Sequence, residues 1–314
     1  MRKYLKKFLF FIVFFLAISL PHFVFSDVYG QKVSFFTDPS YDINQREKIT
    51  ATLRHLSTRA YFYLEDEWWN ELSSQEKKEV QRAVTNLGRE FDTKIYPILT
   101  STFGSEWKPG IDKDERITIF IHRMSERVGG YFNNGNEYYK FQNPKSNERE
   151  MVYLNAKHLG TPLAKSYLAH EFTHLIEFNQ KERIRKTEEE IWLNEARAEL
   201  APTIVGYDDL DYQNSNLFQR VKQFLNSPSD SLTEWKNEEA DYGVVNIFFQ
   251  YLLDHYGLRI LTDSLLTEKR GIDSINEALK RNGYQKDFSQ IFTDWTIAVF
   301  LGSCKSNEAF CYKN

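Results

Sequence analysis

LAHEFTHLIE, residues 168–177, is the stretch of sequence that decides the fold. His170 and His174 stand four positions apart, and helical residues with this spacing lie on one face, about one turn from each other. Both imidazoles can therefore reach a single ion. Glu171 is displaced from them by about 100 degrees and faces the open coordination position.

The residues around this stretch predict the helix that the spacing needs. Thr161 is the expected N-cap, and Pro162 at the first helical position begins a helix that should continue to about Phe178. Apolar side chains on the opposite face would anchor it in the core: Leu168, Phe172, Leu175 and Ile176. The alternative is a buried helix with two hydrogen-bonded histidines and a solvated glutamate.

A second helix is predicted from the segment WLNEARAEL, residues 192–200. Thr187 followed by Glu190 indicates a capping box, which would begin a helix over residues 191–201. Pro202 should then kink or stop that helix. A reversal of the chain between the two helices would make them antiparallel neighbours.

Glu195 on this second helix is the third candidate ligand, 195 − 174 = 21 positions after His174. Three protein ligands with a fourth position open to water are the composition of a catalytic zinc site. Glu199 lies one turn further on the same face, so its carboxylate could accept the free ring N–H of His170. The alternative for Glu199 is an unpaired carboxylate in solvent.

Together, HEFTH and WLNEARAEL resemble the gluzincin metallopeptidases, the thermolysin-like group in which an HExxH helix is followed by an NE-containing helix that supplies a glutamate ligand. Within this group the chain is most similar to hyicolysin-type bacterial peptidases, with further likeness at residues 95–97, 110–114 and 129–132. The sequence departs from the pattern at Glu199, where thermolysin-like enzymes usually have Asp.

The resemblance implies one Zn²⁺ per chain, bound by His170, His174 and Glu195, with Glu171 as general base and Glu199 orienting the first histidine. It implies a zincin-like α+β fold. An N-terminal subdomain of mixed sheet and helices, residues 27–180, would carry the HExxH helix. A mainly helical C-terminal subdomain, residues 181–314, would carry the third ligand, and the active site would lie in the cleft between them.

The activity that the resemblance implies is that of a secreted zinc-dependent metallopeptidase acting on a protein or peptide substrate. Tyr242 is the candidate donor to the oxyanion, because several gluzincins use a tyrosine after the ligand helix, although it could equally be a packing residue. His255 is the weaker rival. Two other functions stay open, an exported catalytically inactive zincin-like binding module and a zinc amidase acting on cell-wall material.

The rest of the chain also predicts an α+β protein, with strands first and helices after. β-branched and aromatic residues indicate strands at residues 33–38, 60–64, 117–121 and 151–154. Ser73 followed by Glu76 predicts a capping box at the start of a helix. Further helices are expected at residues 242–256, ended by Gly257, and twice between residues 272 and 301.

The N-terminus predicts export to a secreted or extracytoplasmic location. A positive segment is followed by an apolar run at residues 8–20 and by Pro21, which is the pattern of a signal peptide over residues 1–26, cleaved after Ser26. The alternative is an uncleaved anchor, but the run is shorter than the ~20 residues that a spanning helix needs. Membrane contact is expected only through this segment.

The charge pattern, the two cysteines and two short segments give the remaining expectations. The net charge of −4 is spread along the chain without a basic block after residue 7, so we expect no binding of nucleic acid. The chain is also expected to be a monomer. Cys304 and Cys311 can form a disulfide after export, the alternative being two free thiols. The acidic turn at residues 110–115 lacks the full calcium-loop pattern, so the sequence does not support a calcium site there and leaves calcium dependence open. Residues 129–132 could lie near a substrate-binding edge strand or form a plain turn.

Overall fold

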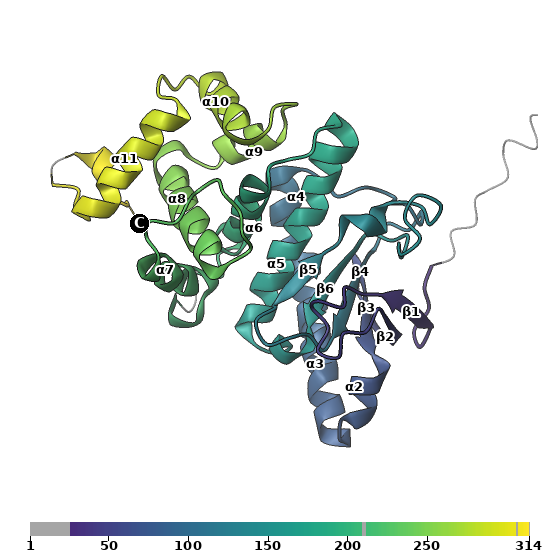
Figure 1. Cartoon of the computed structure of the whole chain (residues 1–314). Coiled ribbons are helices and arrows are strands. Elements are labelled where there is room, and N and C mark those ends of the chain that lie inside the picture. Colours follow the sequence, from purple (N-terminus) through teal and green to yellow (C-terminus); the bar gives the residue numbers. More distant parts are fainter. Residues whose placement is uncertain (1–25, 209–211, 306, 314) are drawn as a thin grey trace, which may run out of the picture.

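The computed structural model describes residues 26–208, 212–305 and 307–313. A twisted sheet and the helices that cover it form one side of the molecule, and the helices of the C-terminal half lie beside them (Figure 1). The elements confirm the predicted α+β class. The predicted signal peptide lies outside the described residues apart from Ser26.

One six-stranded sheet has the order β1-β2-β3-β4-β6-β5. The inner strands β3, β4 and β6 are parallel, and the other pairs are antiparallel. The strands are β1 (Lys32–Phe36), β2 (Lys48–Leu56), β3 (Ala60–Glu65), β4 (Ile117–His122), β5 (Gly130–Phe132) and β6 (Met151–Asn155). Because β5 is paired on one side only, its other edge is open. The four predicted strands are present, whereas β2 was missed because Lys, Thr and Arg interrupt its apolar residues.

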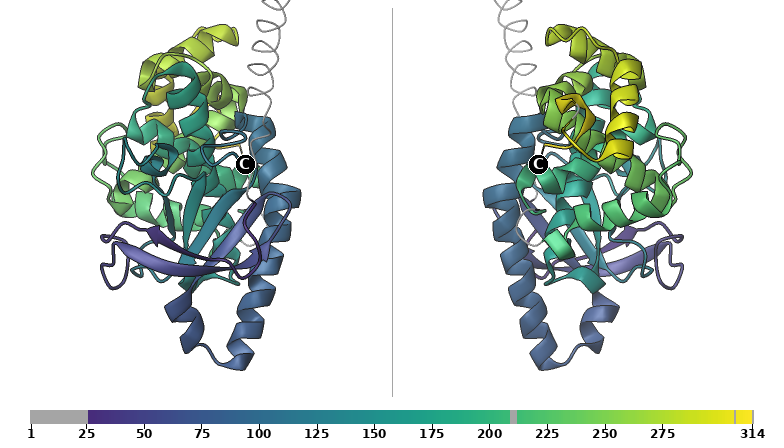
Figure 2. Two further views of the ribbon diagram at one scale, coloured as in Figure 1. Left: turned by 90° about the vertical axis from the view of Figure 1, so that its right-hand side faces the viewer. Right: turned by 90° about the vertical axis from the view of Figure 1, so that its left-hand side faces the viewer.

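The first helices form a hairpin and a long column. The hairpin consists of α2 (Asp66–Glu71) and α3 (Ser74–Glu90), and α3 continues without a break through η1 (Phe91–Ile95) into α4 (Tyr96–Phe103). Figure 2 shows this column running along one side of the sheet. The predicted capping box is present, with the Ser73 hydroxyl accepting a hydrogen bond from the backbone of Glu76.

The two central helices are α5 (Pro162–Glu177), extended by η4 (Phe178–Ile184), and α6 (Ile191–Val205). Their predicted caps were partly wrong. Thr161 is the N-cap of α5 but its hydroxyl donates to the carbonyl of His158 at 2.7 Å, not to the helix. The predicted capping box at Thr187 is absent, because its hydroxyl bonds to the carbonyl oxygens of Arg185 and Glu268.

The end of α6 also differs from its prediction. Pro202 does not stop the helix, which continues to Val205 and ends at Gly206 with a φ of 78°. A proline removes only one helical hydrogen bond, and the buried neighbours of Pro202 keep the last turn in place. Glycine is the residue that adopts this left-handed end most readily.

Five further helices follow: α7 (Asn216–Asn226), α8 (Glu239–Tyr256), α9 (Arg259–Leu265), α10 (Gly271–Arg281) and α11 (Phe288–Leu301). Gly257 ends α8 as predicted, while Glu238 and Asp241 form a capping box that begins it three residues early. Short 3-10 turns are η2 (Asn134–Glu137), η3 (Ala156–His158), η5 (Tyr212–Asn214) and η6 (Glu308–Phe310). The Cys304–Cys311 disulfide is present.

A continuous apolar core runs from the sheet through α5 and α6 to α8 and α11. Phe172 lies near its centre, where its ring contacts those of Phe91 and Tyr96 at centroid distances of 5.0 and 5.4 Å. A smaller apolar cluster covers the other face of the sheet. The division of the chain near residue 180 stays a prediction.

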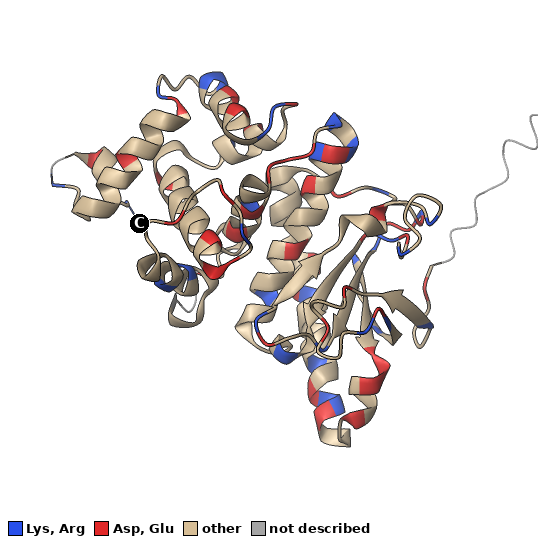
Figure 3. Cartoon of the chain, viewed as in Figure 1, with Lys and Arg blue, Asp and Glu red and all other residues tan. Residues whose placement is uncertain are grey.

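Positive and negative side chains are mixed over the surface (Figure 3). Figure 3 shows Lys and Arg interspersed with Asp and Glu over the strand-bearing part and the helical part. Across residues 26–208, 212–305 and 307–313, none of the helices has both the length and the apolar character needed to cross a membrane.

Replacing Phe172 with alanine tests how α5 is anchored. We expect Phe172→Ala to lower the free energy of unfolding by about 3–5 kcal/mol, because it leaves a cavity between two fixed rings. Urea unfolding followed by circular dichroism measures the change. Phe141→Ala is the control, since that ring is 83% exposed and its loss should change stability by under about 0.5 kcal/mol.

Candidate metal centre

Three predicted ligands converge where α5 packs against α6. The Nε2 atoms of His170 and His174 are 3.1 Å apart, and Oε2 of Glu195 lies 3.4 Å from the first and 3.6 Å from the second. A tetrahedral zinc ion with ligands at about 2.0–2.1 Å requires neighbouring ligand atoms about 3.3 Å apart. The three separations agree with that geometry.

Each of the three atoms is also available to a metal. Two neutral imidazoles cannot both donate across the gap between His170 and His174, so at least one of the facing nitrogens offers a lone pair. Oε2 of Glu195 is buried and makes no hydrogen bond to a described residue. The residues present therefore fit a zinc ion with an open fourth position.

Hydrogen bonds on the far side of each ring fix its orientation. Nδ1 of His170 lies 3.3 Å from Oε1 of Glu199, as expected for the orienting carboxylate. Nδ1 of His174 lies 2.6 Å from the side-chain oxygen of Asn194. Protons held on both Nδ1 atoms leave the Nε2 lone pairs for the metal. Asn194 was not predicted, although it directly precedes Glu195 in the sequence.

Glu199 is itself held by residues that the sequence did not single out. Arg220 of α7 donates to both of its carboxylate oxygens at 2.6 and 2.7 Å, and Asn216 adds a hydrogen bond at 3.0 Å. Burial alone would raise the pKa of Glu199, but Arg220 and His170 lower it, so the group remains an anion. Arg220 lies among other polar residues of an amphipathic helix, and no spacing in the sequence marks it.

Burial and charge separate the carboxylates at the centre. Burial raises the pKa of Glu171 to about 7, despite the opposing effect of the two histidines. Burial also disfavours the charged form of Glu195, but His174 and His170 lower its pKa to about 2. One carboxylate is therefore suited to exchange a proton near neutral pH, and the other to remain a ligand.

A cavity of about 200 Å³ opens over these groups. It is lined by Tyr41, Gly130, Tyr131, Phe132, His170, Glu171, His174, Asn194, Glu195 and Tyr242. A neighbouring hollow of about 340 Å³ shares part of this lining, so the two form one cleft.

The edge strand β5 forms one wall of the cleft. A Cβ atom at Gly130 would lie 2.6 Å from the carbonyl oxygen of Tyr153 and 3.0 Å from Cγ of Glu171. Glycine is thus required for the edge strand to approach Glu171 this closely. Of the two alternatives for residues 129–132, the structure has the edge strand, which borders the metal-binding residues.

The two candidates for an oxyanion donor occupy different places. Tyr242 lines the cavity, where its hydroxyl donates to Asn237 at 3.0 Å and its ring lies 4.8 Å from the guanidinium of Arg220. His255 instead lies 2.8 Å from the carbonyl of Cys311, near the C-terminus, as a structural residue would. Tyr41 also lines the cavity and was missed, because it lies in a loop far from the motifs in sequence.

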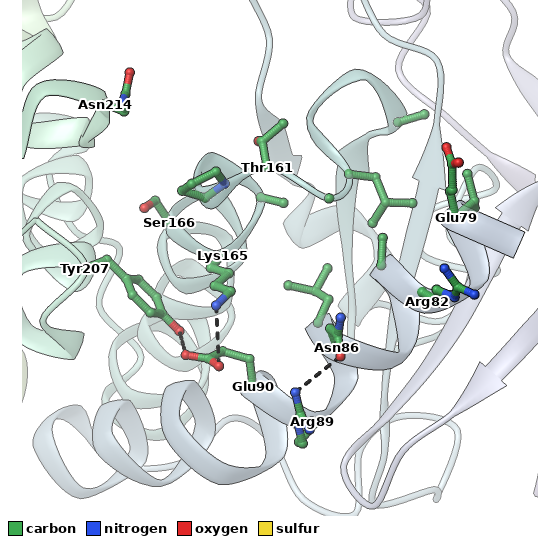
Figure 4. Close-up of a pocket in the computed structure, with 18 of the residues that line it drawn as sticks. Glu79, Arg82, Asn86, Arg89, Glu90, Thr161, Lys165, Ser166, Tyr207 and Asn214 are labelled. Atoms are coloured by element: carbon green, nitrogen blue, oxygen red, sulfur yellow. Dashed lines mark hydrogen bonds and ion pairs between the residues drawn. The ribbon is translucent and has the colours of Figure 1, made fainter. Parts of the chain in front are cut away.

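A larger cavity lies elsewhere. It measures about 970 Å³ and runs between α3 and the first turns of α5 (Figure 4). Two of its charged groups form an ion pair, since Glu90 lies 3.5 Å from Lys165 and also accepts a hydrogen bond from Tyr207 at 3.1 Å. It offers nothing comparable to the three convergent ligand atoms.

Comparison with known proteins shows a similarity to one group of enzymes. No protein-family model matches the chain. It is similar to a neutral metalloprotease. The relative is ShpI of Staphylococcus hyicus, 26% identical over 294 residues, and the match covers 85% of this chain and 62% of the relative. The chain therefore spans less than two thirds of that protein's length. The similarity supports a metallopeptidase relationship in general.

Removing the carboxylate of Glu199 tests whether its contact with Nδ1 of His170 supports metal binding. We expect Glu199→Ala to weaken zinc affinity by about 10–100-fold, because His170 loses the acceptor that fixes its ring. Competition with a chromogenic chelator measures the affinity. Glu79→Ala on the exposed face of α3 is the control. Unchanged zinc affinity in the Glu199 variant would remove this residue from the site.

Proposed function

We propose that the chain is a zinc-dependent metallopeptidase that hydrolyses peptide bonds. The observation that carries the proposal is the convergence of His170, His174 and Glu195 with separations of 3.1–3.6 Å between their ligand atoms. Two nitrogens and one carboxylate oxygen with an open position are typical of catalytic zinc. The name of the 26% identical relative supports the same class.

The chain's own residues have separate parts in the proposed reaction. Zinc held by the three ligands would polarise the scissile carbonyl and acidify a water. Glu171, in the same cavity, accepts the proton from that water on its carboxylate and then donates it to the leaving amine. Before zinc binds, burial raises the pKa of Glu171 to about 7, and a bound zinc ion would favour its carboxylate form, which is the form that accepts the proton.

The open edge of β5 is the proposed position of the substrate backbone. An extended peptide can add to a sheet edge through main-chain hydrogen bonds. Gly130 brings this edge against Glu171, so a peptide paired there would pass over the metal ligands. Tyr242 or Tyr41 would then donate to the developing oxyanion. Export through residues 1–26 remains part of the proposal.

Replacing the base separates metal binding from turnover. We expect the parent to contain about one zinc per chain and Glu171→Gln to keep it while losing roughly 10²–10⁴-fold in turnover, because an amide cannot accept the proton. Elemental analysis measures zinc, and digestion of casein or a peptide library measures turnover. As the matched control, a chelator should remove both zinc and activity from the parent, and added zinc should restore them.

Other outcomes of this experiment identify the alternatives. Zinc binding without hydrolysis by the parent would indicate a catalytically inactive binding module. Cleavage of cell-wall amides with no cleavage of peptides or casein would indicate an amidase. Absence of bound zinc would contradict the proposed function itself.

Two tyrosine variants locate the oxyanion donor. We expect Tyr242→Phe to lower kcat by about 10²–10³-fold with zinc still bound, because one donor to the transition state is lost. Tyr41→Phe is the matched comparison, since Tyr41 lines the same cavity. Steady-state kinetics distinguishes the two. A full kcat in Tyr242→Phe with a reduced kcat in Tyr41→Phe would transfer the role to Tyr41.

A further inference from the structure

A second group of acidic side chains lies in the connection from β5 to β6. Glu137 ends η2 and Glu150 directly precedes β6. The two residues are only 4% and 2% exposed. Both carboxylate oxygens of Glu137 and Oε2 of Glu150 are buried without a hydrogen-bond partner among the described residues. The two carboxyl groups lie within hydrogen-bond reach of each other. Such a pair is unfavourable unless a proton or a cation joins it.

The backbone is shaped to hold this pair. The N–H of Ile111 donates to Oε1 of Glu150 at 2.7 Å. Gly110 has a φ of +88°, and a Cβ atom there would lie only 1.8 Å from Oε2 of Glu150. The connection from α4 to β4 therefore packs directly against one carboxylate, at a position that only glycine can occupy.

Protein cations balance the local charge only in part, since Arg149, which acts on Asp112, is paired with Asp27. Asp112 of the same connection adds a third negative group, and burial raises the pKa of Glu150 to about 7. Arg183 is the cation that acts on Glu137, but its guanidinium stacks on Trp107 at 3.6 Å. Within the described ranges, neither glutamate forms an ion pair with Lys or Arg.

We propose that Glu137 and Glu150, assisted by Asp112, form a calcium site distinct from the zinc centre. Every donor in the group is an oxygen, which favours a hard cation over zinc. Calcium accepts six to eight oxygens in flexible geometry, so water and backbone carbonyls can complete its coordination. The acidic turn alone gave no calcium pattern, because the two buried carboxylates come from positions 137 and 150.

The site would join three segments that are separate in sequence. These are the connection from α4 to β4, the η2 turn and the start of β6. Glu137 and Glu150 stand near the two ends of the chain that links β5 to β6. A bound calcium ion therefore holds the segment that follows the open edge strand.

Thermal unfolding of the full chain tests the proposal, with calcium first removed by a chelating resin and one equivalent of zinc then restored. We expect 10 mM CaCl₂ to raise the Tm of the parent by on the order of 5 °C, because the ion binds only the folded state. Glu137→Gln and Glu150→Gln should lose that rise. Without calcium, the same variants should unfold at a higher temperature than the parent, because each removes one of two buried like charges.

Glu148→Gln is the matched control, since this residue lies in the same connection but pairs with Lys140 at 3.1 Å. It should keep the full calcium response. The proposal is overturned if CaCl₂ fails to raise the Tm of the parent, or if the rise persists in Glu137→Gln and Glu150→Gln. A glutamine variant that is more stable than a calcium-insensitive parent would indicate a shared proton instead.

A measurement on the parent alone covers the case in which a variant does not fold. Tb³⁺ occupies calcium sites, and its emission is excited through nearby tryptophan. Trp107 lies in the same connection as Asp112. We expect tryptophan-sensitised Tb³⁺ emission that CaCl₂ displaces at millimolar concentration and MgCl₂ displaces less. Emission that CaCl₂ cannot displace would contradict a calcium site.

Discussion

The packing of α5 against α6 is the contact on which the rest of the structure depends. This packing must place three ligand atoms from two helices about 3.3 Å apart. Both helices are buried on nearly all sides, so apolar contacts alone do not determine how each helix is rotated and shifted against the other. The ion pairs of Arg197 fix the position of one helix relative to the other. Arg197 is fully buried and joins Glu177 at the end of α5 to Glu189 before α6, each at 3.1 Å.

This buried network also reaches the C-terminal helices. Arg197 donates to the hydroxyl of Ser264 in α9 at 2.9 Å, and Lys181 lies 3.3 Å from Glu189. Buried ion pairs contribute little net stability, but breaking one partner is strongly unfavourable, so they define one register of packing. The C-terminal helices therefore take part in fixing the metal-binding helices. Arg220 does the same from α7 by holding Glu199.

The sequence predicted the parts of the site that follow from helical periodicity. The spacing of His170 and His174 and the placement of Glu195 and Glu199 on one face need only the geometry of a single helix. Asn194, Arg220 and Tyr41 were missed because their roles depend on how separate elements meet in space. The cap at Thr187 was wrong for a related reason, since a tertiary contact with residue 268 replaced the local hydrogen bond.

Two groups of acidic side chains adjoin the segments next to the short strand β5. Glu171 is buried and Glu195 half-buried beside the histidines, and Gly130 packs against Glu171. The chain that leaves β5 leads to Glu137 and returns through Glu150. A strand of three residues paired along one edge has few hydrogen bonds of its own. The position of β5 therefore depends on the contacts of the segments before and after it. In both places those contacts include carboxylates, whose charge a bound cation can balance.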